Sequence, residues 1–266
     1  MSDQLLEQIM DAAREAGGIM LSARDGQKSV KSKEGHANFV TEYDEKIQRF
    51  LIDRLSAILP EAAFVGEEEG KGNFEEAFRN GFTFIIDPID GTSNFMKGYR
   101  PSVTSIGLLK DDKPYLGVIY NPYYDEMIYA KKGEGAFCNG EKLSTSEDTL
   151  ADSLVLMGTC PYYEPEVSHA AFELGFYYQQ RSIDVRRSGT CAYDLCSVAA
   201  GRTGLYFEPR VYVWDYAAGA CIVQEAGGRV TDLQGRELNF RGKSSILAVS
   251  KGVAGESYLP PDSLQL

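Results

Sequence analysis

The spacing of the hydrophobic residues changes near residue 62, and this change limits the folds open to the chain more than any other feature. Hydrophobic residues recur every three or four positions over 3–24 and again over 47–58, shortly before Pro60, so both segments are predicted to be amphipathic helices. Short apolar runs separated by turn residues then predict strands at 62–65, 82–86, 103–109 and 116–120. The first half is therefore expected to be two helices followed by a sheet of the meander type.

The second half alternates between strand and helix patterns. Strands are predicted at 153–157 and 203–207 and near 229 and 246, and helices near 190–200 and 215–226. We therefore expect a mixed α/β chain in two closely joined parts, an α+β part over residues 1–145 and an α/β part over 146–266. A polar stretch at 25–37 predicts a loop, and the glycine-bearing segment 133–140 lacks the G-x-G-x-x-G spacing and is interpreted as structural.

Acidic residues dominate the charge of the chain. It has 266 residues, with 39 Asp and Glu against 27 Lys and Arg, which gives a net charge of −12. This excess argues against nucleic acid and anionic membranes as partners, because both are bound by clustered basic residues. A phosphate ester should also be repelled, unless cations lie between it and the protein.

The early residues include acids and no apolar run of the signal-peptide type, and no segment reaches the ~18 apolar residues of a membrane helix. The five cysteines form no C-x-x-C pair, which is typical of reduced thiols. We therefore expect a cytoplasmic protein. With only two histidines, the chain is a poor candidate for a His-rich metal site or a Ser-His-Asp triad.

The chemistry is expected where acids follow strands. Asp87 and Asp90 lie three residues apart after the apolar run at 82–86, and the Ile89 carbonyl lies between them. Carboxylate and carbonyl oxygens are the ligands that a hard divalent cation prefers. The N–H groups from Gly91 to Ser93, at a predicted helix start near Asn94, would face an anion. Pro88 is expected to end sheet pairing.

Simpler interpretations of these acids stay open. Asp90 could merely cap the following helix, Glu67 could be a surface residue, and Asp215 could cap the helix that follows it. Together the three segments indicate a site built at strand ends. An EF-hand is excluded because its twelfth position would be Gly98, and D-x-D and Walker motifs are missing.

Several motifs, in order along the chain, resemble those of the inositol monophosphatase family. They are Gly66-Glu67-Glu68, Asp87-Pro88-Ile89-Asp90-Gly91-Thr92-Ser93-Asn94-Phe95 and Trp214-Asp215-Tyr216-Ala217-Ala218-Gly219, with Glu225-Ala226-Gly227-Gly228 after them. The resemblance extends through 39–44 and 133–140. It implies a layered αβαβα sandwich of the fructose-bisphosphatase and inositol monophosphatase type, and a magnesium-dependent, lithium-sensitive phosphatase.

The resemblance also implies roles for single residues. One Mg²⁺ would be held by Glu67, Asp87 and the Ile89 carbonyl. A second would be held by Asp87, Asp90 and Asp215, and a third ion would lie near Glu67. Thr92 and Asp44 would position the attacking water, and Glu67 and Asp90 would share in catalysis. Substrate contacts would come from Asp90, Gly91, Thr92, Ser93, Gly189, Thr190, Glu208 and Asp215. Asn38 stands where many relatives have Asp, and Lys33 matches a basic residue that covers the metal site in relatives.

The implied reaction is hydrolysis of a small phosphate monoester, with inositol monophosphate favoured because Asn94-Phe95 follows the motif. Other esters of the superfamily are alternatives: fructose 1,6-bisphosphate, histidinol phosphate, 3′-phosphoadenosine 5′-phosphate and NADP. A metal-dependent binding module without turnover is an alternative of a different class. Relatives also imply a homodimer. The surface candidates Tyr123-Tyr124, Tyr162-Tyr163 and Tyr177-Tyr178 could form its contact or could instead rim the pocket.

Overall fold

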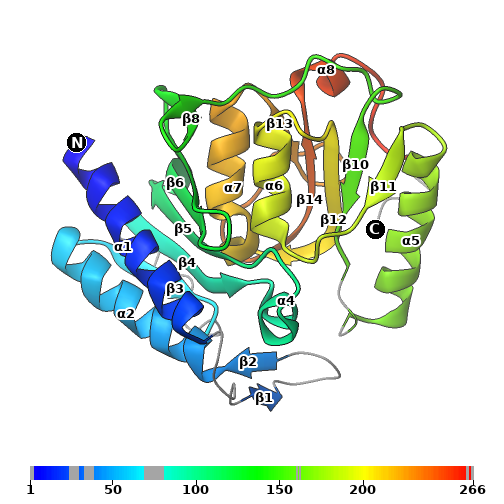
Figure 1. Ribbon diagram of the computed structural model, residues 1–266. Helices are drawn as coiled ribbons and strands as arrows, with labels where there is room; N and C mark the ends of the chain where they lie inside the picture. Colours follow the sequence, from blue (N-terminus) through cyan, green and yellow to red (C-terminus); the bar gives the residue numbers. More distant parts are fainter. Residues whose placement is uncertain are drawn as a thin grey trace.

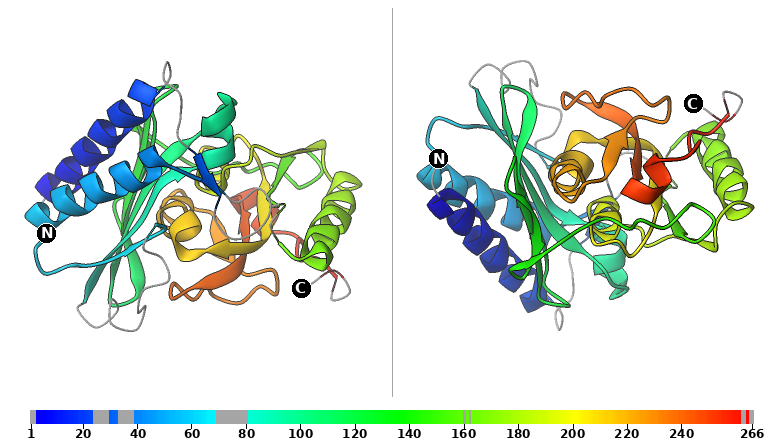
Figure 2. Two further views of the ribbon diagram at one scale, coloured as in Figure 1. Left: turned by 90° about the horizontal axis from the view of Figure 1, so that it is seen from below. Right: turned by 90° about the horizontal axis from the view of Figure 1, so that it is seen from above.

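A computed structural model describes residues 3–23, 30–32, 39–68, 81–159, 161, 163–261 and 264. Its elements form five layers (Figures 1 and 2). The outer helices α1 (Asp3–Ser22) and α2 (Glu42–Ile58) cover one face of the first sheet. Between the two sheets lie α6 (Cys191–Ala199) and α7 (Val213–Glu225). The outer face of the second sheet is covered by α5 (Pro165–Gln179). The predicted αβαβα sandwich is confirmed.

The first sheet has seven strands in the order of the sequence. They are β3 (Ala63–Gly66), β4 (Phe82–Asp90), β5 (Val103–Lys110), β6 (Lys113–Asn121), β7 (Glu126–Lys131), β8 (Gly135–Cys138) and β9 (Glu141–Lys142). Only β3 and β4 are parallel, and the rest form the predicted meander. The segment 133–140 is structural, because it contains β8 and its Gly133 and Gly135 N–H groups donate to Glu225 of α7 at 2.9 and 3.0 Å.

The second sheet has five strands in the order β11-β10-β12-β14-β13. They are β10 (Leu154–Met157), β11 (Asp184–Arg186), β12 (Leu205–Tyr212), β13 (Arg229–Thr231) and β14 (Lys243–Val249). Strand β10 pairs in parallel with β11 and β12, and β14 is antiparallel to β12 and β13. Two short helices complete the described elements, α4 (Thr92–Lys97) and α8 (Lys251–Ala254).

Several elements differ from the sequence-based expectation near the beginning of the chain and in its second half. Helix α2 begins at Glu42, before its apolar pattern, because the Thr41 N–H donates to the Asp44 carboxylate at 2.9 Å in a capping box. The predicted loop at 25–37 contains β1 (Val30–Ser32), which pairs with β2 (Phe39–Thr41), and its other residues lie outside the described part of the chain.

The sequence analysis did not predict helix α5, because apolar residues lie on two of its faces. Leu174 and Tyr178 pack into the core, while Phe172 and Phe176 are 60% and 67% exposed, so the pattern lacks a polar side. Tyr178 was also expected as a surface candidate. That prediction is wrong, because its ring is fully buried and its hydroxyl donates to the Tyr258 carbonyl at 2.9 Å.

Strands of the first sheet all precede residue 143, and strands of the second all follow residue 153. A division at residue 145 nevertheless stays a prediction. Helices α6 and α7 come from the second half of the chain, yet they contact β5 of the first sheet and share a hydrophobic core with it.

The backbone of α7 lies directly on the first sheet. Gly107 and Gly117 face each other on β5 and β6, and a Cβ atom at Gly117 would stand 2.4 Å from the Ala218 carbonyl oxygen. A Cβ atom at Gly107 would stand 3.0 Å from the Cβ atom of Ala217. These glycines therefore set how closely α7, with Asp215 in its first turn, approaches β4 and β5.

We predict that Gly117→Ala lowers the free energy of unfolding by about 2–3 kcal/mol, the usual effect of overpacking against atoms that cannot move aside. Gly18→Ala is the matched control, because its helical position has no atom within 4 Å of the new Cβ. That variant should be more stable by about 0.5–1 kcal/mol, since alanine favours helix more than glycine does. Urea unfolding followed by circular dichroism measures both, and equal stability of the two variants would contradict the packing argument.

Candidate active site

An irregularity at the end of β4 turns two acids to the same face of the sheet. Asp87 pairs with Ser105 and Asp90 pairs with Val103, so β4 has one more residue than β5 in this interval. Residues three apart in a regular strand point to opposite faces, and the extra residue cancels this alternation. Both carboxylates therefore face α6 and α7. The expectation that Pro88 ends sheet pairing is wrong, because the bulge accommodates it and β4 continues to Asp90.

The turn after β4 leads directly into α4. Gly91 has φ of 87°, and a Cβ atom there would stand 2.7 Å from the Thr190 hydroxyl, so this position requires glycine. The helix begins at Thr92, two residues before the expected start. Asp90 does not cap it. Its Oδ2 instead accepts a hydrogen bond at 2.6 Å from the N–H of Ala192, at the beginning of α6.

Asp215 lies in the first turn of α7 rather than at its N-cap. Tyr212 is the N-cap residue, and its N–H donates to Asp215 Oδ2 at 2.6 Å. The capping interpretation is therefore correct for one oxygen of Asp215, while the side chain also lines the pocket described below. Glu67 follows β3, and its N–H donates to the Ile86 carbonyl of β4 at 3.1 Å.

Thr92 and Asp44 contact each other across the chain, as the resemblance implied. The Thr92 Oγ1 lies 3.2 Å from Asp44 Oδ1 and 3.1 Å from the Ile89 carbonyl oxygen, so its single proton has two acceptors within reach. Asp44 is fully buried at the beginning of α2. This residue therefore fixes the orientation of the Thr92 hydroxyl from behind the pocket.

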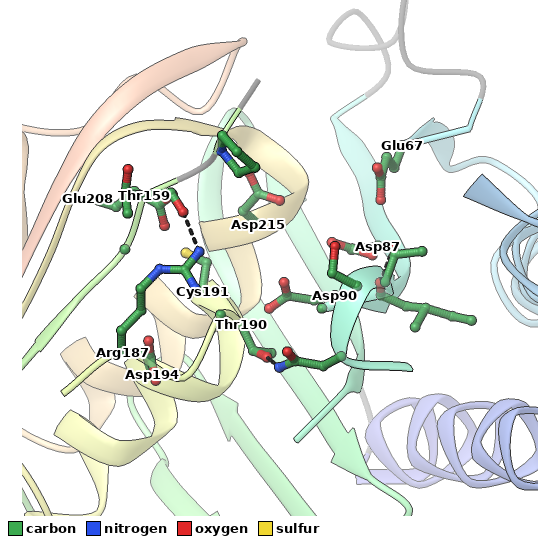
Figure 3. Close-up of a pocket in the computed structure, with 18 of the residues that line it drawn as sticks. Glu67, Asp87, Asp90, Thr159, Arg187, Thr190, Cys191, Asp194, Glu208 and Asp215 are labelled. Carbon is green, nitrogen blue, oxygen red and sulfur yellow. Dashed lines mark hydrogen bonds between the residues drawn. The ribbon is translucent and has the colours of Figure 1, made fainter. Parts of the chain in front are cut away.

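One pocket of about 140 Å³ collects the predicted site residues, with Asp44 as the exception. Figure 3 shows Glu67, Asp87 and Asp90 on one wall and Asp215 and Glu208 toward the other. The predicted residues that line it are Glu67, Asp87, Ile89, Asp90, Gly91, Thr92, Ser93, Gly189, Thr190, Glu208 and Asp215. Lys33 and Asn38 lie outside the described residues.

Sequence analysis missed several lining residues, among them Asn94, Thr159, Arg187 and Asp194. Asn94 joins the two walls, because its Nδ2 donates to the Pro101 and Ser188 carbonyls at 2.8 and 3.0 Å and to the Thr190 hydroxyl at 3.2 Å. The available signal was the polar run 187–190, which immediately precedes the predicted helix near 190–200.

Burial and mutual repulsion raise the pKa of three of the acids. Burial is the main cause for Asp87, and the charges of Glu67, Asp90 and Asp215 add to it, so its pKa lies well above the ordinary value. The pKa of Asp215 is raised by burial and by Asp90 and Glu67. Burial also raises the pKa of Asp90 to about 8, although the hydrogen bond from Ala192 opposes this shift. Ionised carboxylates in this pocket therefore favour a nearby cation.

The donor set fits a hard divalent cation. The Oδ1 atom of Asp87 is buried and has no hydrogen-bond partner among the described residues, as an oxygen available to a metal would be. Within the described residues, no three Asp, Glu, His or Cys side chains converge closely enough to hold an ion as they stand. Asp90 and Asp215 each accept a backbone hydrogen bond instead. The described helices include none that is long and apolar enough to span a membrane.

Residues 1–260 match the inositol monophosphatase family. Inositol monophosphatase 2 of Solanum lycopersicum is 36% identical over 90% of this chain and 91% of its own length. Inositol monophosphatase 1 of Homo sapiens is 31% identical over 94% and 91% of the two chains.

Solved structures show the same similarity. The Thermotoga maritima IMPase superposes with a TM-score of 0.84 at 30% identity, covering 96% of this chain and 94% of that one. The extragenic suppressor protein suhB of Bartonella henselae also has a TM-score of 0.84, at 31% identity, over 94% and 95% of the two chains. The predicted family is confirmed, and the chain belongs to the inositol monophosphatase family, a family of metal-dependent phosphoric monoester hydrolases.

Proposed function

We propose that this chain hydrolyses inositol monophosphate, or a closely related small phosphate monoester, with Mg²⁺. The observation that carries the proposal is the shared pocket of Glu67, Asp87, Asp90 and Thr92 with Asp215. A similar protein, SaIMPase-II, is described as bound to inositol monophosphate in one structure and to 2′AMP in another, at 28% identity each. The alcohol part of the ester is therefore less restricted than the phosphate.

The proposed metal ligands are Glu67, Asp87, Asp90, Asp215 and the Ile89 carbonyl, for two to three ions. Bound Mg²⁺ would acidify a water molecule and offset the charge that develops on the leaving alkoxide. Oxygen donors suit this ion, which seldom binds through sulfur or imidazole. The four carboxylates could then stay ionised at neutral pH, because each would face a cation rather than only its acidic neighbours.

The chain's own groups orient the reactants. The Thr92 hydroxyl can accept a hydrogen bond from the attacking water while it donates to Asp44, 3.2 Å away. Histidine is not needed as a base in this arrangement. The N–H groups of Gly91, Thr92 and Ser93 would bind the phosphate at the beginning of α4.

Gly189, Thr190 and Glu208 are proposed to line the alcohol side. Glu208 is buried, and the Tyr206 hydroxyl donates to its Oε2 at 2.7 Å. A Cβ atom at Gly158 would stand 2.0 Å from the same oxygen, so this glycine makes room for the carboxylate. A fixed acceptor on this wall favours an alcohol with hydroxyl groups, as in a polyol.

A cytoplasmic homodimer is the assembly we propose. Tyr99 and Tyr124 are 62% and 54% exposed, and the Arg100 guanidinium lies 4.8 Å from the ring centroid of Tyr123, so these residues are candidates for the contact between the two subunits. Tyr163 instead lines the pocket, and Tyr162 lies outside the described residues. Reduced cysteines support the compartment, since Cys138, Cys191, Cys196 and Cys221 are free thiols.

The first test is phosphate release from a panel of esters with Mg²⁺, with and without lithium. We expect release from inositol 1-phosphate that stops when Mg²⁺ is removed, and the ranking of kcat/KM over the panel identifies the preferred ester. Failure to release phosphate from every ester, in a protein that still binds Mg²⁺, would favour the binding module without turnover.

We predict that Thr92→Ala and Asp90→Asn each lower kcat by at least about 100-fold, as expected when a positioned catalytic group is lost. Thr92→Ser is the matched control, because it keeps the hydroxyl beside Asp44 and should retain most of the activity. Steady-state kinetics of the purified variants measures the effect. Near-wild-type turnover of Thr92→Ala would refute the role assigned to the hydroxyl.

Metal binding can be followed without turnover, because the only tryptophan of the chain, Trp214, adjoins Asp215 and stacks on Tyr212 at 4.5 Å. Addition of Mg²⁺ should change its fluorescence in a saturable way, and Asp87→Asn should require more Mg²⁺ for the same change.

We also predict that phosphate esters bind only with the metal present, because the acids of the pocket repel them otherwise. Tight ester binding in excess EDTA, measured by calorimetry, would contradict this prediction.

A further inference from the structure

Arg187 places a positive charge in a pocket of acids. Among the described residues that line the pocket, Glu67, Asp87, Asp90, Asp194, Glu208 and Asp215 are acidic, and Arg187 alone is basic. Figure 3 shows its side chain on the wall opposite Glu67 and Asp87, pointing toward Thr159. This guanidinium therefore lies across the pocket from the proposed phosphate side.

The guanidinium is held by backbone and leaves donors for a ligand. One Nη atom donates to the Thr159 carbonyl at 2.6 Å. The other Nη atom lies beside Gly189, 3.7 Å from the position of a Cβ atom there. No carboxylate of the described residues lies within ion-pair distance of Arg187, although arginine has five N–H donors.

The position of Arg187 in the chain puts it on the alcohol side. It begins the run 187–190, which contains Gly189 and Thr190 and leads into α6. Buried Asp194 lies one turn into α6, near the same run. Burial raises the pKa of its carboxyl well above the ordinary value, while a hydrogen bond with Ser188 and the charge of Arg187 oppose this shift. The arginine is thus anchored to the wall that the proposed function assigns to the leaving alcohol.

We propose that Arg187 binds a second anionic group in the alcohol part of the substrate, so that esters carrying a further phosphate or carboxylate are preferred over neutral ones. The inference rests on the proposed function and, among its small phosphate monoesters, favours those with an anionic alcohol part over inositol monophosphate, whose alcohol part is neutral. An acidic wall would repel such a group, and a planar guanidinium with free donors is the side chain that best binds phosphate or carboxylate.

Two matched pairs of esters test this preference. Glycerol 2-phosphate and 2-phosphoglycerate differ by one carboxylate near the reacting phosphate, while fructose 1-phosphate and fructose 1,6-bisphosphate differ by a phosphate at longer reach. The wild type should have the higher kcat/KM for the anionic member of at least one pair. In that pair, Arg187→Gln should lower kcat/KM of the anionic ester by at least about 10-fold, chiefly through KM, and that of the neutral ester by less than about 3-fold.

Arg186→Gln is the matched control, because it removes the same charge one residue earlier. Both arginines are exposed, but Arg186 forms an ion pair with Asp184 and does not line the pocket, so the ratio of the two esters should stay unchanged in Arg186→Gln. The inference is wrong if the wild type prefers the neutral ester in both pairs, or if Arg187→Gln lowers both members alike. If none of the four esters and no inositol 1-phosphate is hydrolysed, the proposed function itself fails. Turnover of the esters without the expected preference overturns the inference alone.

Discussion

The site depends on the contact between the α7 backbone and the first sheet. At Gly107 and Gly117 the sheet has no side chain between its backbone and the helix, and at Gly219 a Cβ atom would stand 2.5 Å from Leu195 of α6. Helix α7 is therefore fixed against β5, β6 and α6 by contacts that leave no room for adjustment. This rigidity places Asp215 opposite the end of β4, and it holds acids together that would otherwise separate.

That placement has an electrostatic cost, which the packing of the core offsets. Asp87, Asp90 and Asp215 are buried beside one another, and each has a raised pKa because burial and neighbouring carboxylates disfavour its charge. Backbone N–H groups reduce this cost for Asp90 and Asp215, whereas Asp87 Oδ1 has no such partner. The three acids can therefore stay buried in the folded chain and still favour a nearby cation. This explains how an acidic chain can act on an anionic ester.

Apolar runs and regular spacing predicted most of the helices and strands along the chain, and the family resemblance implied the order of the layers. The meander and the helices α6 and α7 all follow such patterns. Features that depend on contacts distant in sequence were not predictable. The bulge at the end of β4 is defined by its pairing with β5, the hydrogen bond of Asp90 reaches α6, and the role of Arg187 appears only when Thr159 lies beside it. Motif resemblance found the acids and, on the opposite wall, Gly189, Thr190 and Glu208, but it did not find Thr159, Arg187 and Asp194.

The two walls differ in what they decide. The end of β4 and the beginning of α4 carry the acids and Thr92, to which the proposed function assigns the reaction, while the run 187–190 is proposed to contact the alcohol. Asn94 and Asp90 hydrogen-bond directly from the first wall to Ser188, Thr190 and Ala192 on the second. Ser188 and Thr190 are therefore tied to the first wall, whereas the Arg187 side chain donates to the Thr159 carbonyl. If the proposed role of Arg187 holds, a substitution at this position would change the preferred ester and leave the hydrogen bonds between the two walls in place.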